Sequence, residues 1–245
     1  MSLTLARRAS AEFAGTALLV AAVVGSGIAA ARLSPTDVGL QLLENAIATA
    51  LALGALILTF GPVSGAHFNP VVSAVDWWLG RRAGTGLTAR DLAAYVVAQT
   101  AGAIVGAVLA DLMFGLPAVA WSGTDRTGGQ LWLAEVVATA GLVLLVFALA
   151  RSGRTSAAPA AVGAYIGAAY WFTSSTSFAN PAVTVGRAFT DTFAGIAPAS
   201  VPGFVAAQLV GGVVAIAALA AWYPDAARTA DAVVVPHLTP ETDTR

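Results

Sequence analysis

Two Asn-Pro pairs are the residues of this sequence whose types and spacing are best suited to chemistry. Asn69-Pro70 and Asn180-Pro181 each begin a short apolar stretch. Asn is a favoured helix N-cap and Pro suits the first helical position, so each pair predicts a helix start. The first N–H groups of a helix lack backbone partners and carry about half a positive charge. The asparagine oxygen can cap its own helix while its NH₂ group donates to a passing hydroxyl. A capping role alone is the alternative.

Two carboxylates lie inside apolar segments, where an ionisable group is a functional candidate by default. Glu12 and Glu135 could relay protons, or each could accept hydrogen bonds from a membrane-embedded loop whose backbone has no helical partner. They occupy matching positions in the two halves of the chain, which favours the loop-supporting role. Gln99 and Gln208 also match each other, and we interpret them as part of the same scaffold.

The composition predicts that a membrane-embedded bundle positions these residues. Hydrophobic residues make up 58% of the chain and charged residues 10%, whereas a soluble domain has about 45–50% and about 25%. Most of the exterior must therefore face lipid. The net charge of −1 provides no basic field for nucleic acid. The chain has no cysteine, and its two histidines, His67 and His237, are far apart in sequence, so neither a metal site nor a cofactor is predicted.

Six apolar segments are long enough for spanning helices, which need about twenty residues. They lie at 11–31, 39–60, 91–113, 131–150, 158–174 and 202–222. Two further apolar stretches, 69–79 and 180–190, begin at the Asn-Pro pairs and are too short to cross. Ten helical residues cover about 15 Å, half of a bilayer core. The sequence therefore predicts an all-α membrane protein with six transmembrane helices and two re-entrant half-helices.

Three segments of the first half recur in the same order in the second half. The pairs are AEFAGTALLV (11–20) with AEVVATAGLV (134–143), SGAHFNPVVS (64–73) with STSFANPAVT (175–184), and YVVAQTAGAIV (95–105) with FVAAQLVGGVV (204–214). Each half holds three spans, and an odd number of spans inverts the second copy in the membrane. The half-helices therefore enter from opposite faces, and their N-termini meet near the midplane. We predict a first repeat at 1–114, a connecting extracellular loop at 115–130, a second repeat at 131–224 and a polar cytoplasmic tail at 225–245.

The arginines predict the orientation, because loops rich in basic residues stay in the cytoplasm. The side that holds both termini collects Arg7, Arg8, Arg81, Arg82, Arg90, Arg151, Arg154, Arg228 and Arg245. The other side keeps Arg32, Arg126 and Arg187. This asymmetry predicts that both termini are cytoplasmic and that the protein lies in the inner (plasma) membrane.

The boxes that begin at Asn69 and Asn180 resemble the paired Asn-Pro-Ala boxes of the aquaporin and glycerol-facilitator family. They occur here as Asn-Pro-Val, ending at Val71, and as Asn-Pro-Ala, ending at Ala182. The resemblance covers about residues 11–222 and extends to a bacterial branch linked with arsenic resistance. It implies six spans, a pore in each subunit with the two boxes at its midplane, and a homotetramer in the lipid bilayer. Val71 departs from the usual Ala, and its branched side chain would change how the two helix tips pack.

In that family a narrow filter lies outside the midplane, formed by residues of the second span, the fifth span and the second re-entrant loop. The family's spacing places Thr49, Ser177 and Val183 at three of its four positions. Val183 stands where the family usually carries an Arg, and Thr49 stands where water-selective members carry a bulky aromatic residue. The fifth-span position is Ala168 on ungapped spacing and Tyr170 with a two-residue gap, and we prefer Tyr170.

Arg187 and His67 are predicted near the two approaches to the pore. Arg187 lies four residues beyond Val183, so on a helix it falls on the same face, one turn toward the outside. It could be a displaced filter charge, or an interfacial arginine that holds loop carbonyls or pairs with Asp191. His67 lies two residues before Asn69 and either lines the cytoplasmic approach or anchors the loop.

The resemblance implies a passive channel for small neutral solutes rather than an enzyme. Glycerol-like polyols, metalloid hydroxides such as As(OH)₃, and water are the expected solutes, because the filter offers hydroxyl groups without a fixed cation. A water-selective aquaporin is one alternative. An ion-coupled secondary transporter is another, and it would need ligands for a coupling ion near the midplane.

Overall fold

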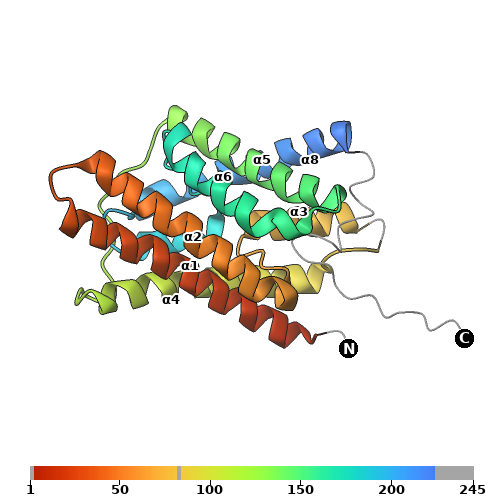
Figure 1. Cartoon of the computed structure of the whole chain (residues 1–245), viewed down its shortest axis with the longest axis horizontal. Helices are drawn as coiled ribbons and strands as arrows, with labels where there is room; N and C mark the ends of the chain where they lie inside the picture. Colours follow the sequence, from red (N-terminus) through yellow and green to blue (C-terminus); the bar gives the residue numbers. More distant parts are fainter. Residues whose placement is uncertain (1–2, 82–83, 224–245) are drawn as a thin grey trace, which may run out of the picture.

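Residues 3–81 and 84–223 are described by the computed structural model, and they form helices joined by loops, with no strand among them (Figure 1). The α-helices are α1 (Leu5–Leu33), α2 (Val38–Ser64), α3 (Pro70–Gly80), α4 (Ala89–Met113), α5 (Gly129–Arg151), α6 (Ala158–Phe172), α7 (Pro181–Gly186) and α8 (Val201–Trp222). The predicted all-α fold is confirmed. The predicted tail at 225–245, with Arg228, His237 and Arg245, lies outside the described residues, and so does Arg82.

Five of the predicted spans form helices that are long and apolar enough to cross a membrane, namely α1, α2, α4, α5 and the helix that ends with α8. The remaining span, predicted at 158–174, is α6, which has 15 residues and ends at Phe172. A 3₁₀ turn at Thr155–Ala157 directly precedes α6. At the other end of α6, the backbone becomes extended at Thr173. The turn and α6 together cover about 28 Å, close to the thickness of a bilayer core.

The two half-helices differ in length. α3 follows its Asn69 N-cap over 11 residues, close to the predicted 69–79. The prediction of a helix over 180–190 is too long, because α7 ends at Gly186 and continues only as a 3₁₀ turn over Arg187–Phe189. The carbonyls of this turn accept hydrogen bonds from outside: Arg187 O accepts from Ile196 N at 3.3 Å, and Phe189 O accepts from Ala120 N at 3.0 Å. These loop contacts replace the next helical turn.

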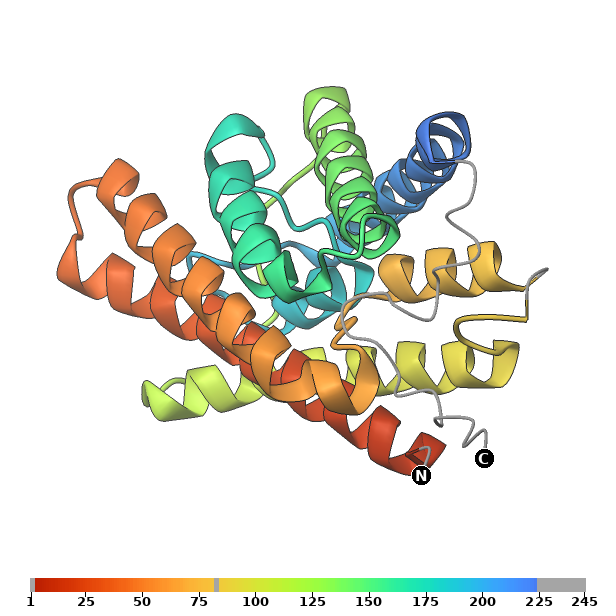
Figure 2. The ribbon, with the colours of Figure 1, turned by 45° about the vertical axis from the view of Figure 1, so that its right-hand side comes forward.

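The two halves of the chain use the same packing. α1 packs against α4 and α5 packs against α8, while α2 packs against α6 between the halves. Gly102 and Gly106 allow the α1–α4 crossing, because a Cβ at these positions would lie 2.4 Å from Phe13 O and 2.2 Å from Ala17 O. α3 and α7 lie on opposite sides of the centre of the bundle in both views (Figures 1 and 2). The beginnings of the two half-helices therefore face the middle of the molecule.

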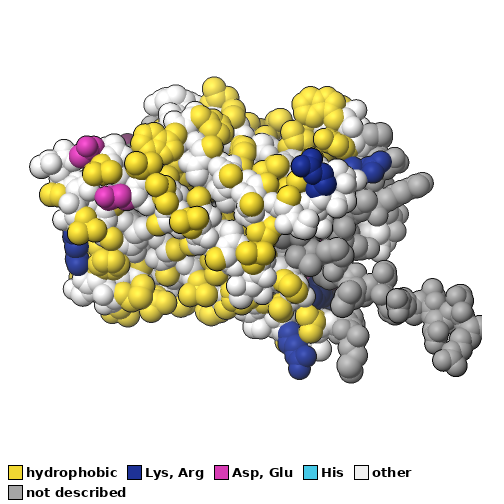
Figure 3. All heavy atoms as spheres, viewed as in Figure 1, with side chains coloured by type: hydrophobic (Ala, Val, Ile, Leu, Met, Phe, Trp, Pro, Cys, Tyr) yellow, Lys and Arg dark blue, Asp and Glu magenta, His cyan; other side chains and the backbone are white. Residues whose placement is uncertain are grey.

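The surface of the bundle carries a broad apolar band. Hydrophobic side chains cover much of the face in Figure 3, while arginines gather toward the end where α1 begins and α8 ends, and acidic side chains appear at the other end. Leu51, Leu58, Val97 and Val213 are among the most exposed large apolar residues. An apolar band between two charged ends is the surface that a bilayer requires.

Candidate functional site

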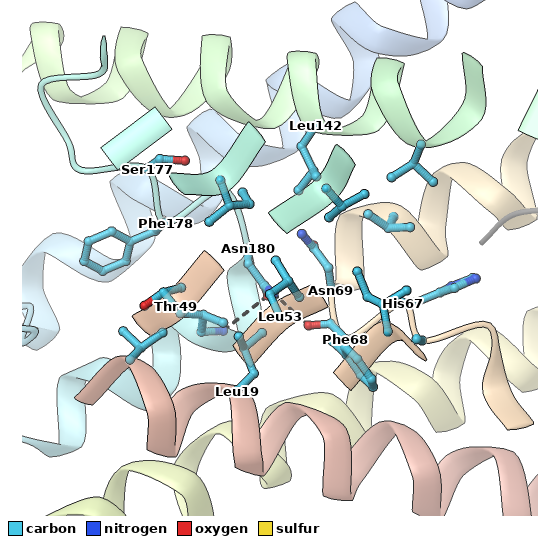
Figure 4. A pocket seen from close by; sticks show the side chains of 18 of the residues that line it. Leu19, Thr49, Leu53, His67, Phe68, Asn69, Leu142, Ser177, Phe178 and Asn180 are labelled. Carbon is cyan, nitrogen blue, oxygen red and sulfur yellow. Dashed lines mark hydrogen bonds between the residues drawn. The ribbon is translucent and has the colours of Figure 1, made fainter. Parts of the chain in front are cut away.

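A cavity of about 70 Å³ lies in the middle of the bundle, between the two half-helices. A water molecule needs about 10–15 Å³ of such volume, so the cavity has room for several water molecules. Its lining includes both Asn69 and Asn180, which meet at its centre in Figure 4. Thr49 and Ser177 lie to one side of this pair and His67 lies to the other.

The two asparagines tie the half-helices to each other. Asn69 Oδ1 caps α3 by accepting from Val71 N at 2.9 Å, while Asn180 Oδ1 accepts from Ala182 N at 3.0 Å and caps α7. The amide groups cross between the halves. Asn69 Nδ2 donates to the carbonyl of Ala179 at 2.7 Å, and Asn180 Nδ2 donates to the carbonyl of Phe68 at 2.7 Å. One N–H of each NH₂ group therefore holds the opposite loop. The second N–H of each NH₂ group remains for the cavity.

The loops that precede the half-helices share an uncommon backbone conformation. Ala66 and Phe68 before α3 have positive φ, as do Thr176, Ser177 and Ala179 before α7. Such a conformation costs of order 1–3 kcal/mol for each non-glycine residue and needs support from its surroundings. It turns consecutive backbone groups toward the cavity or toward the scaffold, and the same pattern appears in both halves.

Glu12 supports the first loop. Its carboxylate accepts from the backbone N–H groups of His67 at 3.0 Å and Phe68 at 2.7 Å. The side chains of Ser64 and Gln99 donate to the same carboxylate at 2.6 Å and 2.8 Å. All of these donors belong to the first half of the chain, so the carboxylate holds its own half-helix in place.

Glu135 supports the second loop with the equivalent contacts. It accepts from the backbone N–H groups of Phe178 at 2.9 Å and Ala179 at 2.8 Å, and from the side chains of Ser175 and Gln208, both at 2.6 Å. Gln99 and Gln208 also donate to the half-helices themselves, to Ser73 Oγ at 3.0 Å and to Thr184 Oγ1 at 2.9 Å. This is the geometry of the loop-supporting interpretation, and neither carboxylate is in the cavity lining.

The four residues assigned to the filter all line the cavity. Thr49 Oγ1 and Tyr170 Oη lie 3.2 Å apart, in hydrogen-bonding contact. Ser177 is 3% exposed, and its Oγ has no hydrogen-bond partner among the described residues. Val183 presents an aliphatic side chain to the same space. Ala168, the alternative to Tyr170, is not in the lining.

Val71 and Ala182, the positions that follow the two Asn-Pro pairs, are not in the cavity lining. The Cβ that Gly212 lacks would lie 2.7 Å from Val71 Cγ1, which shows that Val71 packs against α8. Ala182 is fully buried. The branch of Val71 therefore fills a space that a glycine of α8 leaves open.

His67 both lines the cavity and holds its loop. Its Nδ1 lies 3.0 Å from Ser73 Oγ, its backbone N–H donates to Glu12, and its ring meets the ring of Tyr95 edge-on at 5.6 Å. The two alternatives considered from the sequence, lining the approach to the pore and anchoring the loop, are thus compatible in His67.

Arg187 is 2% exposed and also lines the cavity, on the side of the filter residues. Its Nε donates to the carbonyl of Ala194, and its Cζ lies 3.4 Å from the centroid of the Phe178 ring. Of the two contacts considered for an interfacial arginine, Arg187 therefore makes the one with a loop carbonyl; it has no salt bridge with Asp191 among the described residues, and the Asp191 carboxylate accepts from Gly123 N at 3.0 Å. Arg8–Asp91 is the one salt bridge among the described residues.

Arg126 approaches the same ring from the loop between α4 and α5. Its Cζ lies 5.1 Å from the Phe178 centroid, and its Nε donates to the carbonyl of Gly195 at 2.9 Å. Burial lowers the pKa of the Arg126 guanidinium, and the negative charge of Glu135 offsets part of this effect. Arg126 is not in the cavity lining.

A comparison with protein families matches residues 1–179 to the major intrinsic protein family. The chain belongs to this family. The resemblance seen in the paired Asn-Pro boxes is thereby confirmed.

Relatives within the major intrinsic protein family differ in how much of the chain they match. An aquaglyceroporin, AqpS of Rhizobium meliloti, is 53% identical and covers 97% of both chains. A probable aquaporin, AqpM of Archaeoglobus fulgidus, is 33% identical over 80% of this chain and 88% of its own. Human aquaporin-5 is 33% identical over 60% of this chain and 53% of its own.

Among solved structures, the X-ray structure of the aquaglyceroporin from Plasmodium falciparum matches with a TM-score of 0.64. The match covers 90% of this chain and 97% of the other chain, at 20% sequence identity. At that identity the likeness shows a shared fold, so this chain has the fold of the major intrinsic protein family.

The apolar wall of the cavity was not predicted from the sequence. Four helices each contribute residues spaced four apart, which are Leu19 and Val23, Leu53 and Ile57, Leu142 and Val146, and Val162 and Ile166. In an apolar span these residues look the same as those that face lipid. The repeat carried a usable signal, because Leu19 and Val23 occupy the same repeat positions as Leu142 and Val146. The spacing of four also continues from Ile166 to Tyr170, and Ala168 lies off that stripe.

Proposed function

We propose that this member of the major intrinsic protein family is a passive pore for water and small neutral solutes. Glycerol-like polyols and metalloid hydroxides such as As(OH)₃ are the proposed solutes beside water. The observation that carries the proposal is the cavity lined by both asparagines and by Thr49, Tyr170, Ser177 and Val183, with Thr49 and Ser177 to one side of the asparagine pair. AqpS of Rhizobium meliloti, a relative that carries the name aquaglyceroporin, supports the choice of solutes.

The chemistry of the lining favours hydroxylated neutral molecules. One part of the wall is aliphatic, whereas Thr49, Ser177 and the asparagine amides offer donors and acceptors. A polyol or metalloid hydroxide that leaves water can keep its hydrogen bonds on one side while its other side faces the aliphatic wall. Val183 keeps the position after the second box free of a bulky charged side chain. Thr49 likewise provides a hydroxyl in place of a large aromatic ring.

An ion-coupled transporter is less well supported than a pore. The two intramembrane carboxylates, Glu12 and Glu135, each accept hydrogen bonds from two backbone N–H groups and two side chains of the loops. Those bonds commit both carboxylates to the loops, so neither is available to bind and release a coupling ion. A pore needs no further titratable ligand, and no enzymatic step is proposed.

We also propose a homotetramer in the inner (plasma) membrane, with both termini in the cytoplasm. The arginine-rich end of the bundle holds the start of α1 and the end of α8, which supports this orientation. Membership of the family supports the tetramer, and each subunit would carry its own pore.

The distinction between a pore and a carrier is tested by transport kinetics in proteoliposomes. We expect glycerol uptake to rise in proportion to the glycerol concentration and to be independent of proton and sodium gradients. Liposomes without protein provide the background rate. Saturation of the rate at millimolar glycerol, or acceleration by an ion gradient, would contradict the proposal.

A further inference from the structure

Arg187 combines three features that the proposed pore does not yet use. It is buried, it lines the cavity, and it forms no salt bridge with any residue that the structure describes. A buried guanidinium is strongly disfavoured unless its donors and its charge serve some contact. Its known contacts are the carbonyl of Ala194 at Nε and the face of the Phe178 ring. Neither contact is an anion, so the positive charge is not neutralised by either of them.

The surroundings of Arg187 hold its guanidinium in one place. The Phe178 ring at 3.4 Å supports its flat face, and the Ala194 carbonyl fixes its Nε edge. Phe178 is itself fixed, because its backbone N–H donates to Glu135 at 2.9 Å. Nη1 and Nη2 of Arg187 form no hydrogen bond with another described residue. The N–H groups on these two nitrogens are therefore available to molecules in the cavity.

The position of Arg187 relative to Val183 explains how a charge reaches the cavity. α7 continues into a 3₁₀ turn at Arg187, so the two residues lie about one turn apart, and both line the cavity. Ser177 lines the same side, and its Oγ has no partner among the described residues. An aliphatic Val183 leaves space beside this hydroxyl, and Arg187 adds a fixed charge close by.

We propose that Arg187 supplies the fixed positive charge of this pore and excludes cations from it, while Val183 leaves the lumen wide for neutral solutes. The inference rests on the proposed function, since exclusion matters only in a conducting pore. Under this inference Val183 sets the width of the pore and Arg187 excludes cations, and the two residues lie four positions apart. Neutral solutes pass a fixed charge with little penalty, whereas a desolvated cation is repelled strongly in a medium of low dielectric.

The alternative is that Arg187 only anchors the loop, and Arg126 provides a matched control for it. Both guanidinium groups contact the Phe178 ring, and each Nε donates to a carbonyl of the same loop, at Ala194 and Gly195. The difference that the test uses is that Arg187 lines the cavity and Arg126 does not. Loss of anchoring should therefore affect both variants, whereas loss of the pore charge should affect Arg187→Gln alone.

The test measures potassium leak, glycerol flux and water flux in the same proteoliposomes, for the wild type, Arg187→Gln, Arg126→Gln and Arg187→Lys. We expect Arg187→Gln to raise potassium leak by about tenfold, and Arg126→Gln to stay within about twofold of the wild type. Arg187→Lys should keep potassium leak low, because it retains the charge although it loses the planar contact with Phe178. If Arg187 only anchors the loop, the potassium leak of Arg187→Lys should instead equal that of Arg187→Gln.

Several outcomes would overturn the inference. An equal rise in potassium leak for Arg187→Gln and Arg126→Gln, or no rise in either, would assign Arg187 to the loop alone. If Arg187→Gln does not enter the vesicles in a normal amount, the test rests on Arg187→Lys. A potassium leak through Arg187→Lys well above that of the wild type would contradict the proposal. Failure of the proposed function looks different, since the wild type itself would then pass no glycerol.

Discussion

At the scale of single residues, the cavity is lined by small side chains at two positions assigned to the filter. Val183 and Thr49 both line it, at sites where a guanidinium or an aromatic ring would occupy part of the lumen. The hydroxyl of Thr49 meets Tyr170 Oη at 3.2 Å, so one polar pair continues the aliphatic stripes of α2 and α6. The wall therefore combines hydrogen-bonding capacity with space, and both are needed for a solute larger than water.

The substitution Val183→Arg tests the contribution of Val183 to that width. The new guanidinium would fill part of the lumen and place a second positive charge about one turn from Arg187. Steric exclusion acts first on larger molecules, so glycerol and arsenite flux should fall by about tenfold or more while water flux falls less. The measurement compares the three fluxes in matched proteoliposomes.

Val183→Met is the control for this prediction, because it adds length without charge. We expect it to lower glycerol flux less than Val183→Arg does. If Val183→Arg inserts normally and the three fluxes keep their wild-type ratios, then Val183 does not line the constriction, and the assignment of the filter is wrong.

Residue types identified the asparagines, and the resemblance to the family identified the filter candidates, but neither gave all of their contacts. Asn69 was recognisable as a cap, yet its bond to Ala179 joins residues 110 positions apart, and no local pattern indicates it. Val71 was assigned to the pore from its neighbours in sequence, whereas its contact with Gly212 lies on another helix. Long-range packing decides such contacts, and no sequence pattern within the boxes records it.

The half-helices are the elements that position the site, and neither is long enough to be stable alone. Isolated helices shorter than about 12–15 residues are marginal in water, and α7 has only six residues. Its stability comes from the Asn180 cap, the packing of α4 and α8 around it, and the loop held by Glu135. The scaffold thus offsets the strain of the positive-φ residues that precede the helix.

The substitution Glu135→Gln tests this support. The amide replaces one acceptor oxygen with an NH₂ group, which then faces donors from Ser175, Phe178, Ala179 or Gln208. Leaving such buried donors unpaired costs about 1–3 kcal/mol. We therefore expect a clear fall in the thermal unfolding temperature in detergent, together with loss of solute flux.

Glu44→Gln is the matched control, because Glu44 accepts from Ser34 Oγ at 2.9 Å and has no part in either loop. It should leave the unfolding temperature close to that of the wild type. Glu12→Gln should behave as Glu135→Gln does, since the two carboxylates have equivalent partners. An unfolding temperature of Glu135→Gln equal to that of Glu44→Gln would contradict the loop-supporting role.

At the scale of elements, hydropathy located the spans well and the helix ends less well. The Asn-Pro signals correctly predicted where α3 and α7 begin, because caps are local features. The end of α7 was predicted too late, since the carbonyls of the 3₁₀ turn that follows it accept hydrogen bonds from Ala120 and Ile196 in loops outside the helix. Helix propensity contains no information about those partners.

The whole molecule is two similar halves joined through α2 and α6 and through the crossed bonds of the asparagines. The repeat in the sequence predicted that the two half-helices meet at their N-termini. Each half holds an odd number of spans, so the second copy must be inverted relative to the first. The size and shape of the cavity were beyond prediction, since the apolar stripes that line it resemble lipid-facing residues in composition. The central claim is that this cavity conducts neutral solutes larger than water.

That claim is tested most directly by the flux of water, glycerol and arsenite through the wild-type protein in one preparation of proteoliposomes. Light scattering after an osmotic step reports water and glycerol, and arsenic content after rapid filtration reports arsenite. The account predicts that all three move faster than in liposomes without protein. Faster water movement, with glycerol and arsenite at the rates of empty liposomes, would show a water-selective pore and contradict it.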